Sequence, residues 1–253
     1  MKQIFSISGY LAVKEVWRNR GRFLLVSLVI ALITLLVLFI AALGEGLGNG
    51  NREYISKLDA DLIVYQAKSD TLIAASRLGR DRLAAVRRVD GVADAGMLGT
   101  ASATLVLPDA EEPLKVAILG VEPGHTGEPS VLDGNQLSTD LAQEAIIDRN
   151  TAIRSGLALG DTLTIRVTQG TRDEFFSLRI VGVTDGQQYS LQPSVFVPFF
   201  TWDRIRPKSE AEVNSSNPVA NVILVRLEDP GQMEEVSQRL TSQVGNIETA
   251  TIK

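Results

Sequence analysis

The chain is 253 residues long, carries a net charge of −5 and contains no cysteine. Without cysteines a disulfide framework is excluded, so any folded part must be held together by an apolar core. The charge is unevenly distributed, because residues 1–43 carry +4 and residues 44–253 carry −9. An acidic domain of this charge repels phosphate backbones, which argues against nucleic acid as a partner.

Residues 1–22 are a basic leader in front of an apolar segment. Within residues 4–17, the side chains of Ile4, Ile7 and Leu11 fall on one side of a helix, as in amphipathic helices at a membrane interface. The alternative is an unstructured basic leader. Tryptophan rings and arginine charges are favoured at the boundary between lipid and water. The predicted interface anchors are therefore Trp17, Arg18, Arg20 and Arg22.

The stretch Phe23–Leu43, FLLVSLVIALITLLVLFIAAL, contains 21 residues and no charge. A helix of this length spans about 31 Å, which matches the ~30 Å hydrocarbon core of a bilayer. A secretory signal peptide has a shorter apolar region, of ~7–15 residues, and a short leader. We therefore predict a retained transmembrane helix over residues 23–43.

Basic residues are concentrated on one side of this helix. Three arginines directly precede it, whereas the first charged residue after it is Glu45. The positive-inside rule then places the N-terminus in the cytoplasm and residues 44–253 outside it.

Four glycines alternate in the segment GEGLGNG that follows the helix. Glycine is a poor helix former and often follows the last helical residue, so we expect the helix to stop here and leave a flexible or tightly turned joint. The spacing does not match the G-x-G-x-x-G phosphate-binding pattern. The hinge candidates are Gly44, Gly46, Gly48 and Gly50.

A β-α-β unit is predicted next. Residues 62–65 read as a strand, residues 76–88 as an amphipathic helix and residues 92–106 as further strand. On the polar side of the helix a solvated face is favoured over a binding patch. The arginines on that side are Arg77, Arg80, Arg82, Arg87 and Arg88.

The middle of the chain reads as a small β-rich region with one short helix. The helix is expected over residues 150–159, ending at Gly160-Asp161. Two of the strands are expected to pair as a hairpin around Gly170. The predicted strands are residues 115–121, 142–148, 162–167, 174–183 and 195–200.

After a polar loop at residues 203–218, the β-α-β pattern returns. Residues 221–227 and 247–252 read as strands around a helix at 230–244, with Asp229 as N-cap and a proline at the first position. The expected class is α+β: one N-terminal transmembrane helix, then two β-α-β (porter-like) units with an inserted small β-rich subdomain. The domains are then residues 1–22, 23–43 and 44–253, the last divided into 52–112, about 113–202, and 219–253.

Patterns typical of catalysis or cofactor binding are absent from the sequence. It has no P-loop, H-E-x-x-H, C-x-x-C or G-x-S-x-G motif, so we expect no catalytic residue, cofactor or metal site. The single histidine, His125, is expected to be solvated in its loop. Asp59, Asp61 and Asp70 lack the spacing of a calcium loop and are expected at the surface. Core packing is favoured over an apolar partner surface for Phe196, Phe199, Phe200 and Trp202.

Five segments occur in a recognisable order: LAVKEVWRNRGRFLL before the apolar helix, then DADLIVYQ, DRNTAIRSGLALGDTLTI, FSLRIVGVTDG and VFVPF. This order resembles the N-terminal half of MacB/FtsX-type ABC-transporter permeases over nearly the whole chain. The resemblance implies a porter-like extracytoplasmic domain with an inserted subdomain. It also implies mechanotransmission, in which a partner ATPase in the cytoplasm moves the extracytoplasmic domains to export or extract substrates.

The partners implied by the resemblance are an ABC ATPase subunit, a second permease chain as homo- or heterodimer, and a periplasmic adaptor protein. The implied location is a bacterial cell (inner) membrane. Family members carry three further transmembrane helices, but no second apolar run of ~18 residues follows Leu43. We therefore expect a fragment of a longer permease or a truncated reading frame. The alternative is a stand-alone membrane-anchored binding or adaptor module, and an anchored hydrolase is disfavoured.

Overall fold

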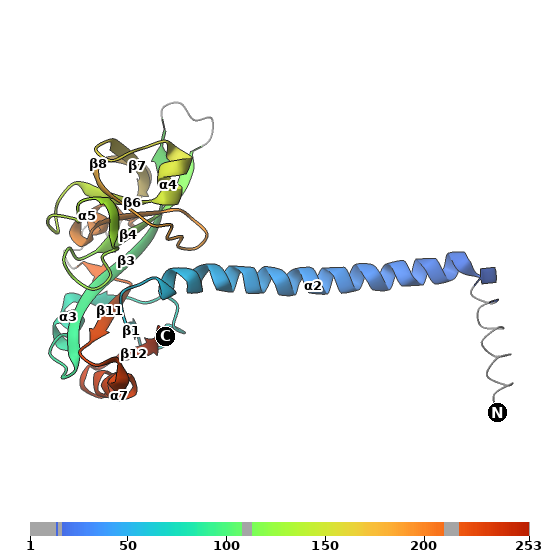
Figure 1. Ribbon diagram of the computed structural model, residues 1–253, viewed down its shortest axis with the longest axis horizontal. Coiled ribbons are helices and arrows are strands. Elements are labelled where there is room, and N and C mark those ends of the chain that lie inside the picture. Colours follow the sequence, from blue (N-terminus) through green and yellow to red (C-terminus); the bar gives the residue numbers. More distant parts are fainter. Residues whose placement is uncertain (1–13, 15–16, 108–112, 210–217, 253) are drawn as a thin grey trace. The chain divides into compact units, whose positions relative to one another are not determined.

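A computed structural model describes residues 14, 17–107, 113–209 and 218–252 (Figure 1). The predicted amphipathic helix over residues 4–17 lies almost entirely outside these residues. The chain divides into two compact units, Met1–Asn49 and Gly50–Lys253.

The first unit contains most of helix α2, Arg20–Ser56. Its part Arg20–Gly44 is long and apolar enough to cross a membrane, and none of it is buried in the structure. The predicted stop at the glycine segment is wrong, because α2 continues through it to Ser56. The long apolar helix before the segment and the burial of Tyr54 after it outweigh the unfavourable propensity of glycine, which is about 1 kcal/mol per residue.

The two predicted β-α-β units are present and form one half of the second unit, which we call the ferredoxin-like half. The first consists of β1 (Leu62–Gln66), α3 (Arg80–Val86) and β3 (Val92–Val106), and the second of β11 (Val222–Leu227), η1 (Pro230–Gln232), α7 (Met233–Gln243) and β12 (Ile247–Thr251). The strand order is β12-β1-β11-β3, and every neighbouring pair is antiparallel. Asp229 caps the second helical segment as predicted, accepting a hydrogen bond from the backbone N–H of Gly231 at 2.9 Å.

The sheet of this half is covered on both faces, because successive side chains of a strand point to opposite sides. Leu62 and Val64 of β1 lie in the same apolar cluster as Leu83 of α3 and Leu240 of α7. Ile63 and Tyr65 of the same strand lie in a second cluster, which contains Tyr54 from the last turn of α2 and Leu58. The last turn of α2 therefore helps to cover the face opposite the two helices.

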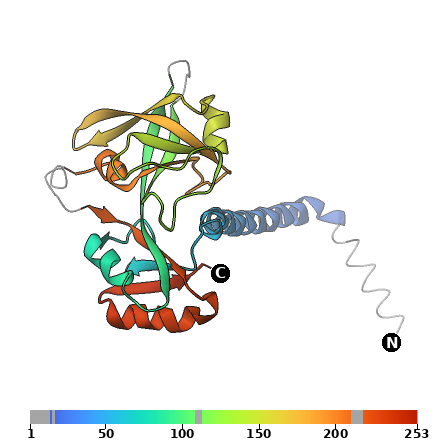
Figure 2. The same cartoon turned by 60° about the vertical axis from the view of Figure 1, so that its left-hand side comes forward.

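Strand β3 and five further strands close into a ring, and we call this part of the second unit the barrel half. Their order β3-β4-β9-β6-β8-β7 returns to β3, because β7 pairs with both β8 and β3. Strand β5 pairs with β8 outside the ring, and β2 pairs with β10 as a separate two-stranded sheet. In Figure 2, β3 runs from one half into the other. The elements are β2 (Leu78–Gly79), β4 (Leu114–Val121), β5 (Val131–Gly134), β6 (Glu144–Asp148), α4 (Arg149–Ser155), β7 (Thr162–Gln169), β8 (Arg172–Thr184), β9 (Ser194–Pro198), α5 (Phe199–Ile205) and β10 (Val219–Ala220).

Several boundaries differ from the predictions. The helix expected over residues 76–88 begins at Arg80, since Leu78 and Gly79 pair with β10. The short helix of the middle region ends at Gly156, whose φ of 72° suits glycine, and not at Gly160. The strand expected at residues 195–200 ends at Pro198, and the first residues of the expected loop belong to α5. Core packing of the aromatic run is confirmed for Phe196, Phe199 and Trp202, which are at most 2% exposed.

The predicted division of residues 44–253 into two porter-like parts and an inserted subdomain, with boundaries at 112/113 and 202/219, remains a proposal. Strand β3 pairs with β11 over its first part and with β4 over its second part, so both halves share it.

Candidate functional site

The last turn of α2 is anchored in the second unit by an aromatic side chain. Tyr54 is 1% exposed and packs edge-to-face against Tyr189, with ring centroids 5.3 Å apart and an interplanar angle of 78°. It belongs to the same apolar cluster as Ile63 of the ferredoxin-like half and Phe196 of the barrel half. The end of the helix is therefore packed against a core to which both halves contribute.

The hydroxyl group of Tyr54 is buried. Its Oη atom has no hydrogen-bond partner among the residues that the structure describes. Burial, followed by the proximity of Tyr189, raises the pKa of Tyr54 well above its ordinary value. The side chain therefore acts as a buried aromatic anchor.

The segment between β8 and β9 adds a polar contact to this anchor. Lys57, directly after α2, donates a hydrogen bond from Nζ to the backbone carbonyl of Gly186 at 2.6 Å. In the same segment, Tyr189 and Gln192 form an isolated antiparallel β-bridge. The two residues between them, Ser190 and Leu191, adopt left-handed φ values of 51° and 62°. We call Tyr54, Lys57 and the residues 186–192 the helix clasp. Because β8 and β9 are barrel strands, the clasp links the end of α2 directly to the barrel half.

Two carboxylates that follow Lys57 connect this segment to β11, one from a buried position and one at the surface. Asp61 is 5% exposed and accepts a hydrogen bond from the backbone N–H of Leu227 at 2.9 Å, so its predicted surface position is wrong. This burial could not be predicted from neighbouring residues, because the partner of Asp61 lies 166 residues away in the chain. Asp59 is exposed as predicted and pairs with Arg226 at 3.3 Å.

The only histidine of the chain is held by a neighbouring carboxylate. His125 is partly exposed, and its Nδ1 lies 2.9 Å from Oδ1 of Asp94. The other oxygen of Asp94 accepts hydrogen bonds from the backbone N–H and hydroxyl of Thr126, at 2.7 and 2.8 Å. Partial burial raises the pKa of Asp94, but the hydrogen bonds from His125 and Thr126 together outweigh it, so this pKa lies below its usual value. This pair ties the loop of residues 122–130 to β3.

The residues predicted as functional are placed as follows. Trp17, Arg18, Arg20 and Arg22 are exposed on helical backbone of the first unit. The four predicted hinge glycines lie within α2, and the boundary between the two units falls beside the last of them, at Asn49/Gly50. Space surrounds Gly44, where an added Cβ atom would meet nothing within 4 Å.

Sequence reasoning missed the clasp. Tyr54 and Leu58 are spaced i, i+4 directly after the glycines, which indicates a continuing amphipathic helix, and this signal was available. The contribution of Tyr189 could not be predicted from the sequence, because this residue lies in a loop far along the chain. Among the described residues no cluster of three or more histidine or acidic side chains could hold a metal ion.

Comparison with known proteins agrees with this architecture. The MacB-like periplasmic core domain family matches residues 23–243. The extracellular domain of the noncanonic ABC-type transporter YknZ from Gram-positive bacteria is similar in fold, with a TM-score of 0.52 and 14% identity over 75% of this chain and 98% of that one. The periplasmic region of MacB from Actinobacillus actinomycetemcomitans is similar too, with a TM-score of 0.53 and 12% identity over 78% of this chain and 91% of that one. The chain therefore belongs to the family that carries the MacB-like periplasmic core domain of ABC-type transporter permeases.

Proposed function

We propose that the chain is the mechanotransmission part of an ABC-transporter permease, in which α2 transmits motion from a cytoplasmic ATPase to the extracytoplasmic domain. The observation that carries the proposal is the helix clasp. Tyr54 joins the end of α2 to an apolar cluster shared by both halves of the domain, and Lys57 joins it to a loop of the barrel half. A displacement of the helix end would therefore reach the barrel strands β8 and β9 without an intervening flexible linker.

The glycine segment is the proposed hinge in this account. Four glycines within seven residues make this part of α2 about 3–4 kcal/mol less favourable as a helix than four alanines would. Helical structure is thus most easily lost here when force acts along the helix. The segment ends at the boundary between the two compact units, which supports a joint at Gly44–Gly50.

The proposed partners follow from the family and from the charge distribution. An ABC ATPase subunit would act at the cytoplasmic side. The basic residues around the start of α2 support a cytoplasmic N-terminus by the positive-inside rule. A second permease chain would complete a homo- or heterodimer, and a periplasmic adaptor is a further proposed partner. The proposed location is a bacterial cell (inner) membrane, with Trp17, Arg18, Arg20 and Arg22 as interface anchors.

Transport by this mechanism requires a membrane unit with more than one helix. The described residues contain one helix of the required length and composition. We propose that the complete permease supplies three further transmembrane helices and that this chain corresponds to its N-terminal part.

The clasp gives the test of this function. In the complete permease with its ATPase, the variant Tyr54→Ala should leave ATP hydrolysis in place but reduce substrate export, because the helix end is no longer held by the domain. Tyr54→Phe is the matched control, because it keeps the ring and removes only a hydroxyl without a described partner. If Tyr54→Ala is present at normal levels in the membrane and exports normally, the clasp does not transmit motion. The chain would then be better described as an anchored binding module.

A further inference from the structure

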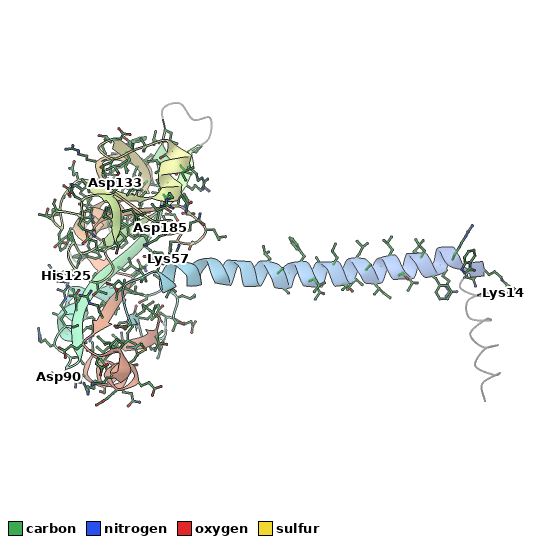
Figure 3. All side chains as sticks on the ribbon, viewed as in Figure 1. Lys14, Lys57, Asp90, His125, Asp133 and Asp185 are labelled. Carbon is green, nitrogen blue, oxygen red and sulfur yellow. The ribbon has the colours of Figure 1, made fainter. Side chains whose placement is uncertain are left out.

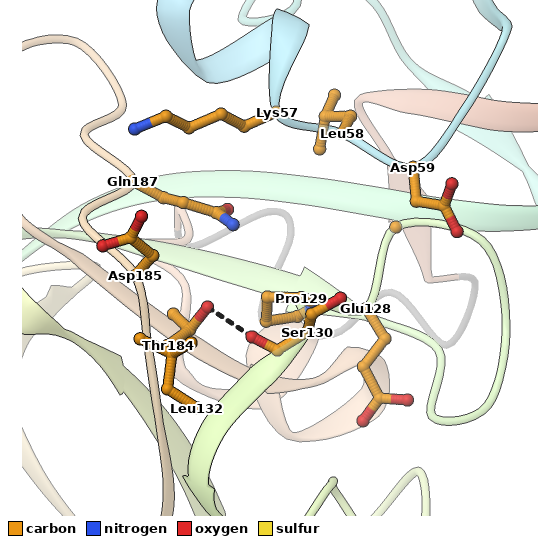
Figure 4. A pocket seen from close by; sticks show the side chains of 11 residues that line it. Lys57, Leu58, Asp59, Glu128, Pro129, Ser130, Leu132, Thr184, Asp185 and Gln187 are labelled. Carbon is orange, nitrogen blue, oxygen red and sulfur yellow. Dashed lines mark hydrogen bonds between the residues drawn. The ribbon is translucent and has the colours of Figure 1, made fainter.

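A pocket of about 230 Å³ opens beside the helix clasp, entirely within the second unit (Figure 4). Its walls come from three segments: the residues directly after α2, the loop before β5 and the end of β8 with the residues that follow it. Figure 3 shows Lys57 and Asp185, which belong to two of these segments, close together at the end of α2. The apolar side chains of Leu58, Pro129 and Leu132 supply contact surface.

One polar side chain in this pocket has no partner. Gln187 is only 8% exposed, and its amide is directed into the pocket in Figure 4. It forms no hydrogen bond with any residue that the structure describes. No group among the described residues competes for this amide, so a ligand in the pocket can pair with it directly. An amide both donates and accepts, so its natural complement is another amide, such as a peptide group.

Four charged side chains line the pocket, the cation Lys57 and the acids Asp59, Glu128 and Asp185, so the lining has a net negative charge that favours a basic ligand. Asp59 and Asp185 are both exposed, and each has only an exposed arginine partner, at 3.3 and 3.4 Å. Such surface pairs are weak, so both carboxylates remain accessible to a ligand cation. The third acid, Glu128, is committed, because its two oxygens accept backbone N–H groups of Gly124 and Leu137 at 2.8 and 2.9 Å. The domain as a whole carries an excess of negative charge, which adds to the attraction.

We propose that this pocket binds an extended, basic polypeptide segment that inserts one apolar side chain. The volume lies below the ~300–1,000 Å³ of pockets for drug-sized ligands, which suits a single side chain and its peptide group. The apolar side chain lies against Leu58, Pro129 and Leu132, and its peptide group pairs with Gln187. Basic neighbours of the inserted residue face Asp59 and Asp185. A segment bound here touches both the residue that follows α2 and the end of β8, so its binding is sensitive to the state of the clasp.

The full-length chain in uncharged detergent micelles allows a direct binding measurement. The probe is a fluorescein-labelled peptide, Ser-Lys-Leu-Lys-Ser, and binding is followed by fluorescence anisotropy against empty micelles. Two matched peptides replace both lysines by glutamate or the leucine by glycine. We expect saturable binding of the first peptide, no binding of the acidic peptide, and affinity reduced about tenfold for the glycine peptide, which lacks the buried apolar side chain.

Variants of the chain locate the binding. Gln187→Leu keeps the approximate size but removes the amide, and should weaken binding about fivefold, as expected for one hydrogen bond. The matched control is Gln238→Leu on the exposed face of α7, which should bind as the parent chain does. The double variant Asp59→Asn with Asp185→Asn changes only exposed side chains, so it tests the charge preference even where Gln187→Leu fails to fold.

The outcomes separate clearly. Reduced affinity in both pocket variants, with Gln238→Leu unchanged, supports the proposal. Equal binding of the lysine and glutamate peptides, binding unaffected by the pocket variants, or no saturable binding of the lysine peptide overturns it. The measurement needs no ATPase, so its failure is distinct from failure of the proposed coupling function.

Discussion

Gly99 and Gly120 lie directly opposite each other on β3 and β4, and the indole ring of Trp202 packs over both. A Cβ atom added at Gly99 would lie 2.5 Å from the indole ring of Trp202. A Cβ atom added at Gly120 would also lie too close to the same side chain for a real contact. The pair of glycines thus forms the seat for α5. Because β3 continues into the ferredoxin-like half, this seat lies on the strand that both halves share.

Filling this seat should destabilise the domain. Gly120→Ala forces Trp202 out of its position, and overpacking of this kind costs about 1–3 kcal/mol in the free energy of unfolding. Urea unfolding of the full-length chain in detergent, followed by tryptophan fluorescence, measures the loss. Gly245→Ala is the control, since its added Cβ would meet only Arg82 Nη1 at 3.9 Å. Equal stability of the two variants would mean that the indole does not rest on Gly120.

The stability of the helix clasp should depend on the aromatic ring of Tyr54 and not on its hydroxyl group. Tyr54→Ala removes a fully buried aromatic ring and should lower the free energy of unfolding by about 3–5 kcal/mol. Tyr54→Phe should change it by less than about 1 kcal/mol, because the lost hydroxyl has no partner among the described residues. The same urea titration compares them. A large loss in the phenylalanine variant would show that the hydroxyl is hydrogen-bonded after all.

Stiffening the glycine segment should impair coupling. Gly46→Leu with Gly48→Leu favours the helical state by about 1.5 kcal/mol, which is about tenfold in the population of the unwound segment. We expect normal membrane insertion and reduced export at an unchanged rate of ATP hydrolysis in the complete permease. Ala41→Leu with Ala42→Leu also introduces two leucines into α2 but removes no glycine, so it serves as the control. Normal export by the stiffened variant would reduce this helix to an anchor.

Asp94 should make the free energy of unfolding depend on pH in the acidic range. Its pKa is lowered in the folded state, so the unfolded state takes up the proton first as the pH falls below about 4. The stabilisation supplied by Asp94 is therefore present above this pH and is lost below it. Asp94→Asn should be less stable at pH 7 and lose less stability between pH 5 and pH 3 than the parent chain. Parallel acid titrations of the two proteins would contradict this role.

Much of the fold was predictable because its signals are local. The apolar run of Phe23–Leu43, the alternation in β1 and the start of the second helical segment at Asp229 each depend on neighbours within a few residues. The β-α-β units follow from the same periodicities. Closure of the barrel half was not predictable, because it depends on β7 pairing with β3 across some sixty residues.

The candidate site was predictable only in part. The glycine segment is visible in the sequence, but the expectation that it stops the helix failed because tertiary packing of Tyr54 and Leu58 extends α2 beyond it. Tyr189 and Gln187 lie in a loop without any recognisable pattern, and the fold brings them beside the end of α2. Likewise, Asp61 is buried by a partner strand that only the topology supplies.

The central claim is that the chain works as a permease component driven by a partner ATPase. The most direct measurement is affinity purification of the full-length permease from native membranes, followed by assay of the purified complex for ATP hydrolysis. We expect that a nucleotide-binding subunit co-purifies in stoichiometric amount and that the complex hydrolyses ATP. A permease purified intact from those membranes with neither the subunit nor any ATP hydrolysis would contradict it.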